Sequence, residues 1–263
     1  MQFLIGCDPE VFVRRNGQFV NAHNLIPGDK KNPHPVRNGA VQVDGMALEF
    51  NTSPAASEDE FASNVQDVLN QLCAMVPEYE VVAVPVADFT EAYLKEQPAE
   101  SLVLGCDPDF NAWTGMPNER PDGNRPMRTA SGHVHIGWGS GFDIENPEHL
   151  NKCRLVSREM DFYLGLPSLF YDADTRRREM YGLPGCHRPK SYGVEYRTLS
   201  NAWLKSEALM RWVYRATQHG LNQLVQGRML SEKYGDISKI ITTSNRAEAE
   251  KIIKAENLEV CYG

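Results

Sequence analysis

Four short segments of the sequence carry acidic, histidine or arginine side chains at alternate positions. These segments are Asp8-Pro9-Glu10, Glu49-Phe50-Asn51, His133-Val134-His135 and Glu195-Tyr196-Arg197. In a strand, alternate side chains share one face of the sheet. Four carboxylates on one face would repel one another unless a cation offsets their charge. Mg²⁺ prefers such oxygen ligands and often shares phosphate oxygens, and basic neighbours would suit a polyphosphate. The pattern therefore predicts a metal–nucleotide site built on a sheet.

Each segment also has a simpler interpretation. A single strand carboxylate is often solvated or salt-bridged at the surface, and Glu195 and Arg197 could pair with neighbouring strands. His133 and His135 could be structural, or could bind zinc as in a hydrolase. Loop arginines are often solvated. The metal–nucleotide interpretation is favoured because four separate segments place their ionisable groups in the same phase.

Other catalytic signatures are absent from the sequence. It has no GxxxxGK[ST] loop, no HExxH helix and no GxSxG elbow, and GWGSG at 137–141 fails the dinucleotide fingerprint. The six cysteines form no CxxC pair, so a reduced cytosolic setting is the simpler expectation.

Composition limits the class of protein. Of 263 residues, 41% are hydrophobic and 24% charged, which excludes a mainly disordered chain. The 27 basic and 35 acidic residues give a net charge of −8, so nucleic-acid binding over the whole surface is not expected. The amino-terminal MQFLIGCDPE does not resemble a signal peptide, and no apolar run approaches membrane-span length. A soluble, cytoplasmic protein is expected.

The candidate residues need strands to position them. Asn16-Gly17 and Asp44-Gly45 predict the turns of two hairpins, joining 11–13 to 18–20 and 41–43 to 46–50. Pro9 has no N–H to donate, so its segment should be an edge, a strand start or a bulge. The sequence GCDPE at 6–10 recurs almost unchanged as GCDPD at 105–109. The repeat could be chance or a turn that both segments share, or it could mark two strands that each bring acidic side chains to one cavity.

The rest of the chain reads as alternating helices, strands and loops. Residues 58–76 have helical periodicity, with Ser57 as the N-cap and Glu60 three residues on. Further helices are predicted at 147–164, 206–226 and 246–256, further strands at 80–87, 102–105, 131–138 and 192–199, and loops at 23–39, 111–128 and 172–191.

The ordered series GCDPE, ALEFN, SGHVHIG and VEYRTLS, within residues 6–201, resembles the glutamine synthetase-like carboxylate–amine ligases. The closest groups are the glutamate–cysteine ligase type and the phage-encoded amidoligases. The loop RRREMYGLPGCHRPKSYGVEYRTLSN is most similar to the phage-type group. Two features depart from the pattern: the first acid is Asp8 followed by Pro9, and the chain is much shorter than the large glutamate–cysteine ligases. No substrate can therefore be carried over.

The resemblance implies a single α+β domain over residues 1–263, with a helical C-terminal part at 206–263. A curved, mostly antiparallel sheet would carry the site, and helices 58–76, 147–164 and 206–226 would cover its other face. The implied activity is ATP-dependent amide formation through an acyl phosphate, with Mg²⁺ or Mn²⁺. The implied metal ligands are Glu10, Glu49, His133 and Glu195. The implied nucleotide contacts are Arg197, Arg188, Asn51 and His135. The implied catalytic residues are Arg197, Arg178, Arg188 and Asp8, with Asp8 or Asp107 as the general base.

The partners implied are a carboxylate and an amine, with no membrane and no nucleic acid. A homo-oligomer is an open alternative, as is the host cytoplasm if the gene is phage-encoded. Three other functions remain open: a guanidino or carboxyl kinase on the same fold, a zinc hydrolase using His133 and His135, and a non-catalytic phage structural or binding protein.

Overall fold

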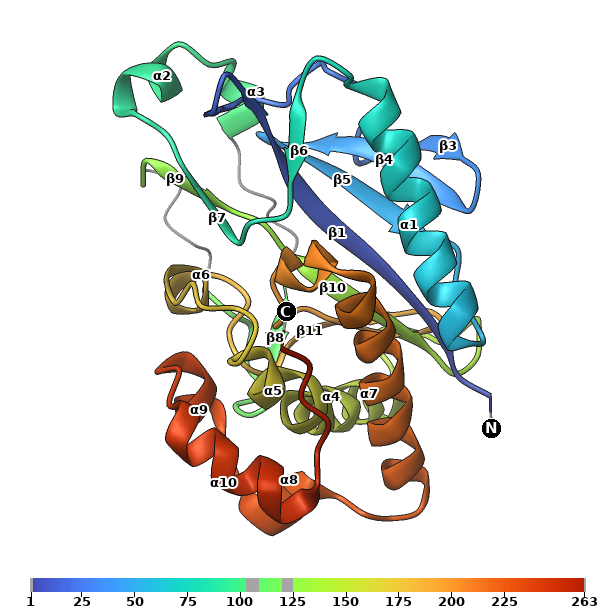
Figure 1. The fold of residues 1–263 in the computed structure, drawn as a ribbon. Coiled ribbons are helices and arrows are strands. Elements are labelled where there is room, and N and C mark those ends of the chain that lie inside the picture. Colours follow the sequence, from blue (N-terminus) through green and yellow to red (C-terminus); the bar gives the residue numbers. More distant parts are fainter. Residues whose placement is uncertain (1, 103–108, 120–124, 263) are drawn as a thin grey trace.

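A large antiparallel sheet forms the centre of the protein (Figure 1). The computed structural model describes residues 2–102, 109–119 and 125–262. The sheet has the order β3-β4-β5-β1-β10-β12-β11-β8, with β2 and β6 also paired to β1. Its strands are β1 (Leu4–Arg15), β2 (Gln18–Val20), β3 (His34–Val36), β4 (Gly39–Asp44), β5 (Ala47–Thr52), β6 (Glu80–Val82), β8 (Phe110–Asn111), β10 (Gly132–Gly137), β11 (Cys186–Lys190) and β12 (Gly193–Tyr196). A separate pair is formed by β7 (Val86–Asp88) and β9 (Met127–Thr129).

The described residues also form helices. They are α1 (Glu58–Met75), α2 (Glu91–Lys95), α3 (Ala99–Leu102), α4 (Pro147–Met160), η1 (Asp161–Gly165), α5 (Leu166–Ser168), α6 (Arg176–Met180), η2 (Asn201–Lys205), α7 (Glu207–Val225), α8 (Leu230–Tyr234), α9 (Ser238–Thr242) and α10 (Arg246–Glu256). α1 packs on β4 and β5, α4 packs on β11 and β12, and α7 packs against both helices. The predicted α+β fold with a mostly antiparallel sheet is confirmed. No helix in the described ranges is long and apolar enough to span a membrane.

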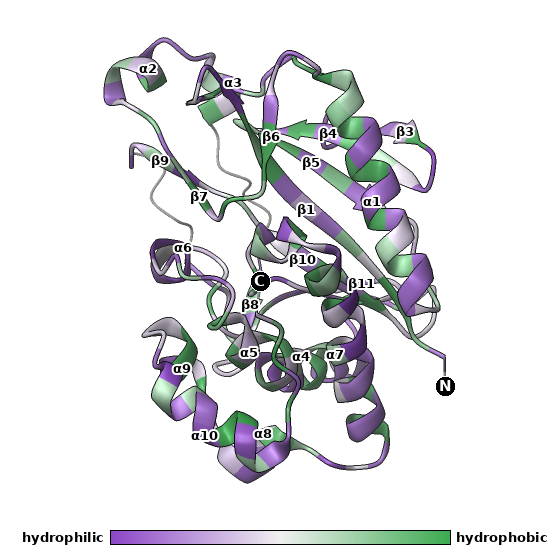
Figure 2. Ribbon diagram, viewed as in Figure 1, coloured by the Kyte–Doolittle hydropathy of each residue, from purple (hydrophilic) through white to green (hydrophobic). Residues whose placement is uncertain are grey.

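Alternation along the strands separates the core from the site. Figure 2 shows hydrophobic and hydrophilic residues alternating along β1. Ile5, Val11 and Val13 are buried in the core between sheet and helices, while Asp8 and Glu10 lie on the opposite face. Helices α1, α4 and α7 bury their apolar stripes against the same core, and α1 begins with the predicted N-cap. The polar face is therefore left for the site.

Pro9 lies inside a central strand, so the predicted edge or strand start is wrong. The pairing on its β5 side nevertheless shifts by one residue between Ile5 opposite Ala55 and Glu10 opposite Glu49, as at the predicted bulge. β1 pairs with β10 on one side and β5 on the other. On the β5 side, the amide of Cys7 donates to the Thr52 hydroxyl at 3.2 Å, and regular pairing begins only at Glu10 opposite Glu49. The nitrogen of Pro9 faces this same side because amide directions alternate along a strand. The missing N–H therefore interrupts no ladder bond.

The two hairpins form as expected, but one turn is displaced. Asn16 and Gly17 both have positive φ, 53° and 78°, as a type I′ turn requires. In the second hairpin Asp44 is the last residue of β4 and pairs with Ala47, so the turn begins at Gly45. The shift of one residue moves Asp44 from the turn into the sheet.

Five other segments differ from the prediction. Residues 80–87 divide into β6 and β7, and the predicted loop 23–39 contains β3. The predicted loop 111–128 contains the end of β8 and most of β9, and the loop 172–191 contains α6 and β11. Of the predicted strand 102–105, residue 102 ends α3 and the rest lies outside the described residues. Short strands such as β11 form through pairing with β12, which local composition does not reveal.

We expect Gly132→Ala to destabilise the protein by about 1–3 kcal/mol, because overpacking has a cost of that size. An added Cβ would overlap the Ser200 carbonyl oxygen and the Trp203 indole nitrogen. Gly137→Ala, at the other end of β10, is the matched control, since its Cβ would lie 3.6 Å from the nearest atom. Urea unfolding of both variants checks this expectation, and equal stabilities would contradict it.

Candidate active site

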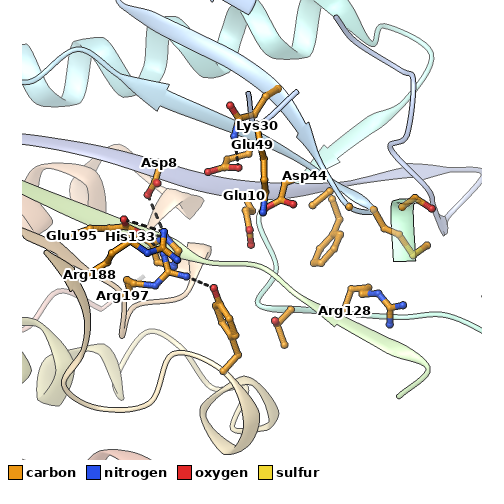
Figure 3. Close-up of a pocket in the computed structure, with 18 of the residues that line it drawn as sticks. Asp8, Glu10, Lys30, Asp44, Glu49, Arg128, His133, Arg188, Glu195 and Arg197 are labelled. Carbon is orange, nitrogen blue, oxygen red and sulfur yellow. Dashed lines mark hydrogen bonds and ion pairs between the residues drawn. The ribbon is translucent and has the colours of Figure 1, made fainter. Parts of the chain in front are cut away.

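One cavity on the polar face of the sheet collects most of the predicted site residues. Its volume is about 260 Å³. The predicted residues that line it are Asp8, Glu10, Glu49, His133, Arg188, Glu195 and Arg197. Figure 3 shows its acidic side chains in two groups, one beside Glu195 and one around Glu10.

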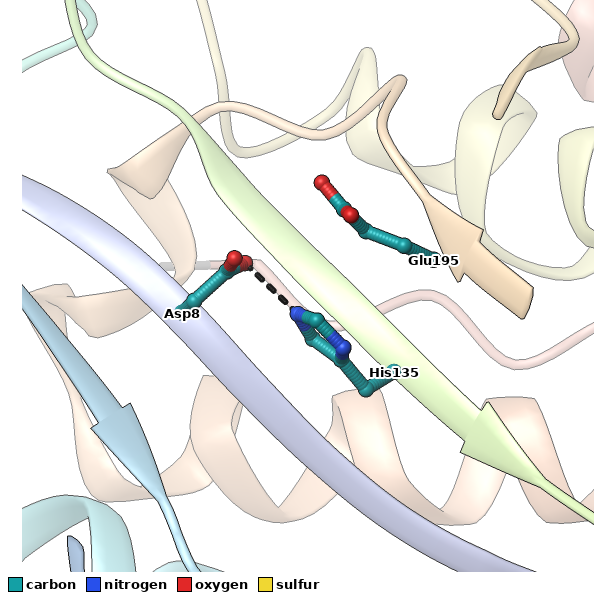
Figure 4. A group of neighbouring side chains, drawn as sticks. All are labelled: Asp8, His135 and Glu195. Atoms are coloured by element: carbon teal, nitrogen blue, oxygen red, sulfur yellow. Dashed lines mark ion pairs between the residues drawn. The ribbon is translucent and has the colours of Figure 1, made fainter. Parts of the chain in front are cut away.

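The first group consists of Asp8, His135 and Glu195, whose ligand atoms lie within 4.8 Å of one another. His135 is directly opposite Glu195 in the register of β10 and β12, and Asp8 projects from the neighbouring strand β1. The Nε2 atom of His135 lies 3.0 Å from Oδ1 of Asp8 (Figure 4). The group therefore follows from strand register, which brings side chains of adjacent strands together on one face.

Both carboxylates of this group are held ionised. Burial alone would raise the pKa of Asp8, but the charge of His135 and the contact with His133 lower it well below its usual value. Burial also opposes ionisation of Glu195, yet the adjacent Arg197 guanidinium holds its pKa well below the usual range. Glu195 is 0% exposed. Buried, ionised carboxylates are suitable ligands for a cation.

His133 is a neutral imidazole beside the same group. Burial, and then the charge of Arg197, lower its pKa to about 4. Its Nδ1 lies 3.3 Å from oxygens of both Asp8 and Glu195, while its buried Nε2 has no hydrogen-bond partner. A proton on Nδ1 would leave the Nε2 lone pair available to a metal or another ligand.

Three basic side chains surround Glu195. Nζ of Lys190 lies 2.8 Å and Nη1 of Arg188 lies 3.4 Å from Oε2 of Glu195, and Arg197 donates to Oε1. The Nε of Arg197 is also 3.1 Å from Oδ2 of Asp109. This cluster places cations where the oxygens of a phosphoryl group could be held.

The second group consists of Glu10, Asp44 and Glu49, again with ligand atoms within 4.8 Å of one another. Glu10 is opposite Glu49 across β1 and β5, and Asp44 comes from β4. Nζ of Lys30 lies 2.7 Å from Asp44, and the Gln42 amide donates to Glu49 at 2.7 Å. Asp44 was missed from the sequence because Asp-Gly indicated a turn.

These three carboxylates repel one another. Burial, and then the charge of Asp44, raise the pKa of Glu10 to about 7, although the Ser131 amide donates to it at 2.7 Å. Burial, and then the charges of Asp8, Asp44 and Glu10, raise the pKa of Glu49 well above its usual value. A bound divalent cation would relieve this repulsion.

The donor set fits divalent metal at both groups. Hard cations such as Mg²⁺ and Mn²⁺ prefer the carboxylate oxygens of both groups, whereas the imidazole of the first group is a better ligand for a transition metal than for Mg²⁺. Oδ1 of Asp8 and Nε2 of His135 lie 3.0 Å apart as an ion pair, and a metal bound at this group would take the place of that contact.

A second cavity, of about 560 Å³, lies along the same face toward the start of β1. Asn51 and His135 both line it, so two of the predicted nucleotide contacts meet here. Its walls include Trp138 and Tyr192, and Tyr192 also hydrogen-bonds Nδ1 of His135. The buried indole N–H of Trp138 has no partner in the described part of the chain. His135 thus contacts Asp8 in the first cavity and lines the second.

Arg178 lies outside both cavities. It is 4% exposed, lies 3.1 Å from the Asp172 carboxylate and donates to the hydroxyl of Ser244 at 3.3 Å. These contacts join α6 to the segment before it and to the turn after α9. Asp107, the alternative base, lies outside the described residues, whereas Asp109 of the same repeat contacts Arg197.

One known family matches part of the chain. The family described as phage phiEco32-like COOH.NH2 ligase-type 2 matches residues 127–232. The match confirms the predicted resemblance to the phage-type amidoligases, and it covers strands β10 and β12 with His133, His135 and Glu195, and Arg197 just after β12. It does not extend to β1, β4 and β5, which carry Asp8 and the three acids of the second group. No curated protein matches the chain.

Proposed function

We propose that this protein is an ATP-dependent ligase that joins the carboxyl group of one substrate to the amino group of another. The observation that carries the proposal is the convergence of two acidic, metal-ligating groups and three cations on one sheet face. The name of the matched family, a COOH.NH2 ligase, supports this class of reaction.

Each part of the site has a role in this proposal. Asp8, His135 and Glu195 hold one divalent cation, and Glu10, Asp44 and Glu49 hold a second. Divalent cations bound there would neutralise phosphate charge during phosphoryl transfer. Arg188, Lys190 and Arg197 orient the γ-phosphate and stabilise its oxygens.

The proposed reaction has two steps, a phosphoryl transfer to the carboxylate and an acyl transfer to the amine. A substrate carboxylate oxygen attacks the γ-phosphorus, the bond to the bridging oxygen breaks, and ADP leaves. The amine then attacks the carbonyl carbon of the acyl phosphate, its N–H proton passes to the departing phosphate, and inorganic phosphate leaves with the electrons of the broken C–O bond. Asp8 is better suited to metal ligation than to proton removal, because its lowered pKa makes it a weak base.

The second cavity suits the base of the nucleotide. It is lined mainly by apolar and aromatic side chains, with few polar groups, as small-molecule sites commonly are. Asn51 supplies an amide, a group that can pair with two atoms of adenine. Because His135 joins the two cavities, a base in the second would place its phosphates toward the first.

We expect Asn51→Ala to raise the KM for ATP by roughly tenfold, since a hydrogen bond to the base contributes about 1 kcal/mol or more. kcat should change little, and discrimination between ATP and GTP should fall. Asn70→Ala, at an exposed position of α1, is the control. Unchanged KM and base preference in Asn51→Ala would place the base elsewhere.

The reaction test follows a heavy-oxygen label. The protein is incubated with ATP, Mg²⁺ or Mn²⁺, and pools of labelled carboxylic acids with amines. A ligase forms ADP, an amide and inorganic phosphate that carries oxygen from the carboxylate. A stable phosphorylated product without amide would indicate a kinase instead. Tightly bound zinc with no effect of nucleotide on melting would indicate a hydrolase, whose His and carboxylate ligands the first group could also supply. Absence of nucleotide binding with any metal would refute both ATP-dependent functions, the ligase and the kinase.

A further inference from the structure

A buried arginine lines the first cavity away from both acidic groups. Arg128 lies on β9 and is 7% exposed. Figure 3 shows it apart from the groups around Glu195 and Glu10. Phe12, Met46 and Met127 also line the cavity, so apolar side chains accompany this arginine.

Arg128 differs from the other cations of the cavity in its partners. The other four each lie within salt-bridge distance of a carboxylate; they are Lys30, Arg188, Lys190 and Arg197. Nη1 of Arg128 instead donates to the backbone carbonyls of Arg125 at 3.0 Å and Met127 at 2.9 Å. Its Nε is buried without a hydrogen-bond partner, and in the described ranges the hydrogen bonds of this guanidinium are made through Nη1.

The unused edge of this guanidinium has a defined chemistry. Nε and Nη2 point their hydrogens in parallel, which matches the two oxygens of a carboxylate. A guanidinium stays charged in a protein, and a buried charge without a counter-ion is unfavourable. Arg177 is also buried without an ion pair, but both of its Nη atoms donate to oxygens, and it does not line the cavity. The Arg128 edge is therefore the one that a ligand can satisfy.

We propose that Arg128 binds a carboxylate on one of the two substrates, in addition to the group that reacts. The substrate would then be a dicarboxylic acid or an amino acid whose aliphatic part lies against the apolar lining. This inference rests on the proposed function, because it names a substrate class for the same site.

Calorimetry with the full chain, Mg²⁺ and a non-hydrolysable ATP analogue tests the assignment. Malonate, succinate, glutarate and adipate are each compared with a monocarboxylate of the same length. Amino acids are compared with alkylamines of the same length. Inorganic phosphate is the remaining probe. We expect at least one probe with the extra carboxylate to bind roughly tenfold or more tightly than its match. Arg128→Gln should remove this preference and Arg128→Lys should keep part of it. Arg125→Gln, at an exposed arginine nearby, should keep all of it.

A preference for dicarboxylates would place the extra carboxylate on the acid substrate, and a preference for amino acids would place it on the amine substrate. Equal binding of matched probes by the wild type, or a preference that survives Arg128→Gln, would overturn the assignment. Arg128-dependent binding of phosphate without binding of carboxylates would also overturn it. Binding of the ATP analogue is measured separately in each variant. If the wild type does not bind the ATP analogue, the proposed function is refuted. If Arg128→Gln still binds the analogue, the variant is folded, and a lost preference for the extra carboxylate is not a folding defect. Titrations without nucleotide keep the two tests independent.

Discussion

Replacing Glu195 by glutamine is expected to reduce ATP-dependent ligation by roughly a hundredfold to a thousandfold, as when a transition-state contact is removed. The carboxylate of Glu195 faces Asp8 and His135 on one side and Arg188, Lys190 and Arg197 on the other. Glutamine preserves the shape but removes the charge. The first group then loses an anionic ligand, and the three cations lose their shared partner. Product formation by mass spectrometry and Mn²⁺ affinity by calorimetry should both fall.

A second buried glutamate separates this effect from loss of stability. Glu159 is 0% exposed and accepts from the amides of Leu230 and Ser231, both at 2.9 Å, outside the cavity. Glu159→Gln should lower the melting temperature yet keep the activity of the folded fraction. Activity and Mn²⁺ affinity retained in a folded Glu195→Gln protein would exclude Glu195 from the site.

The polar face of the sheet was predictable because strand alternation is a local property. Asp8 with Glu10, His133 with His135 and Glu195 with Arg197 each fall on one face whatever the neighbouring strands are. The pairing register is not local. It places His135 rather than His133 opposite Glu195, and so decides which histidine joins the group of Asp8 and Glu195.

The remaining site residues depend on longer-range contacts. Asp44 becomes part of the second group only because the hairpin turn starts one residue later than Asp-Gly suggested. Lys190 faces Glu195 because β11 pairs with β12, and the basic composition of 172–191 indicated a loop. Arg178 and Arg177 are adjacent on α6, and tertiary contacts alone direct both away from the cavity. Arg128 carried no sequence signal, since it lies in a segment rich in proline and arginine.

The two acidic groups also lead to a dependence of stability on pH and metal. In the metal-free protein the pKa of Glu10 is raised to about 7, above the ordinary 4.5, first by burial and then by the charge of Asp44. The folded state therefore binds the proton more tightly than the unfolded state. The stabilisation is complete below the ordinary pKa and is lost as pH rises through about 7, by up to about 3 kcal/mol from this group. The raised pKa of Glu49 acts in the same direction.

Metal should reverse this trend, because a divalent cation binds the deprotonated carboxylates in place of protons. We expect the melting temperature in chelator to fall between about pH 5 and pH 8, and the rise caused by Mg²⁺ or Mn²⁺ to grow over the same interval. Glu10→Gln imitates the protonated side chain, so it should flatten the first curve and weaken the metal response.

Asp161→Asn is the matched control. Burial raises the pKa of Asp161 to about 6 despite hydrogen bonds from Trp113 and Tyr196, and it is not among the cavity residues. That variant should therefore lose part of the pH dependence but keep the whole metal response. A metal response that is independent of pH, or unchanged in Glu10→Gln, would show that metal does not bind at the second group.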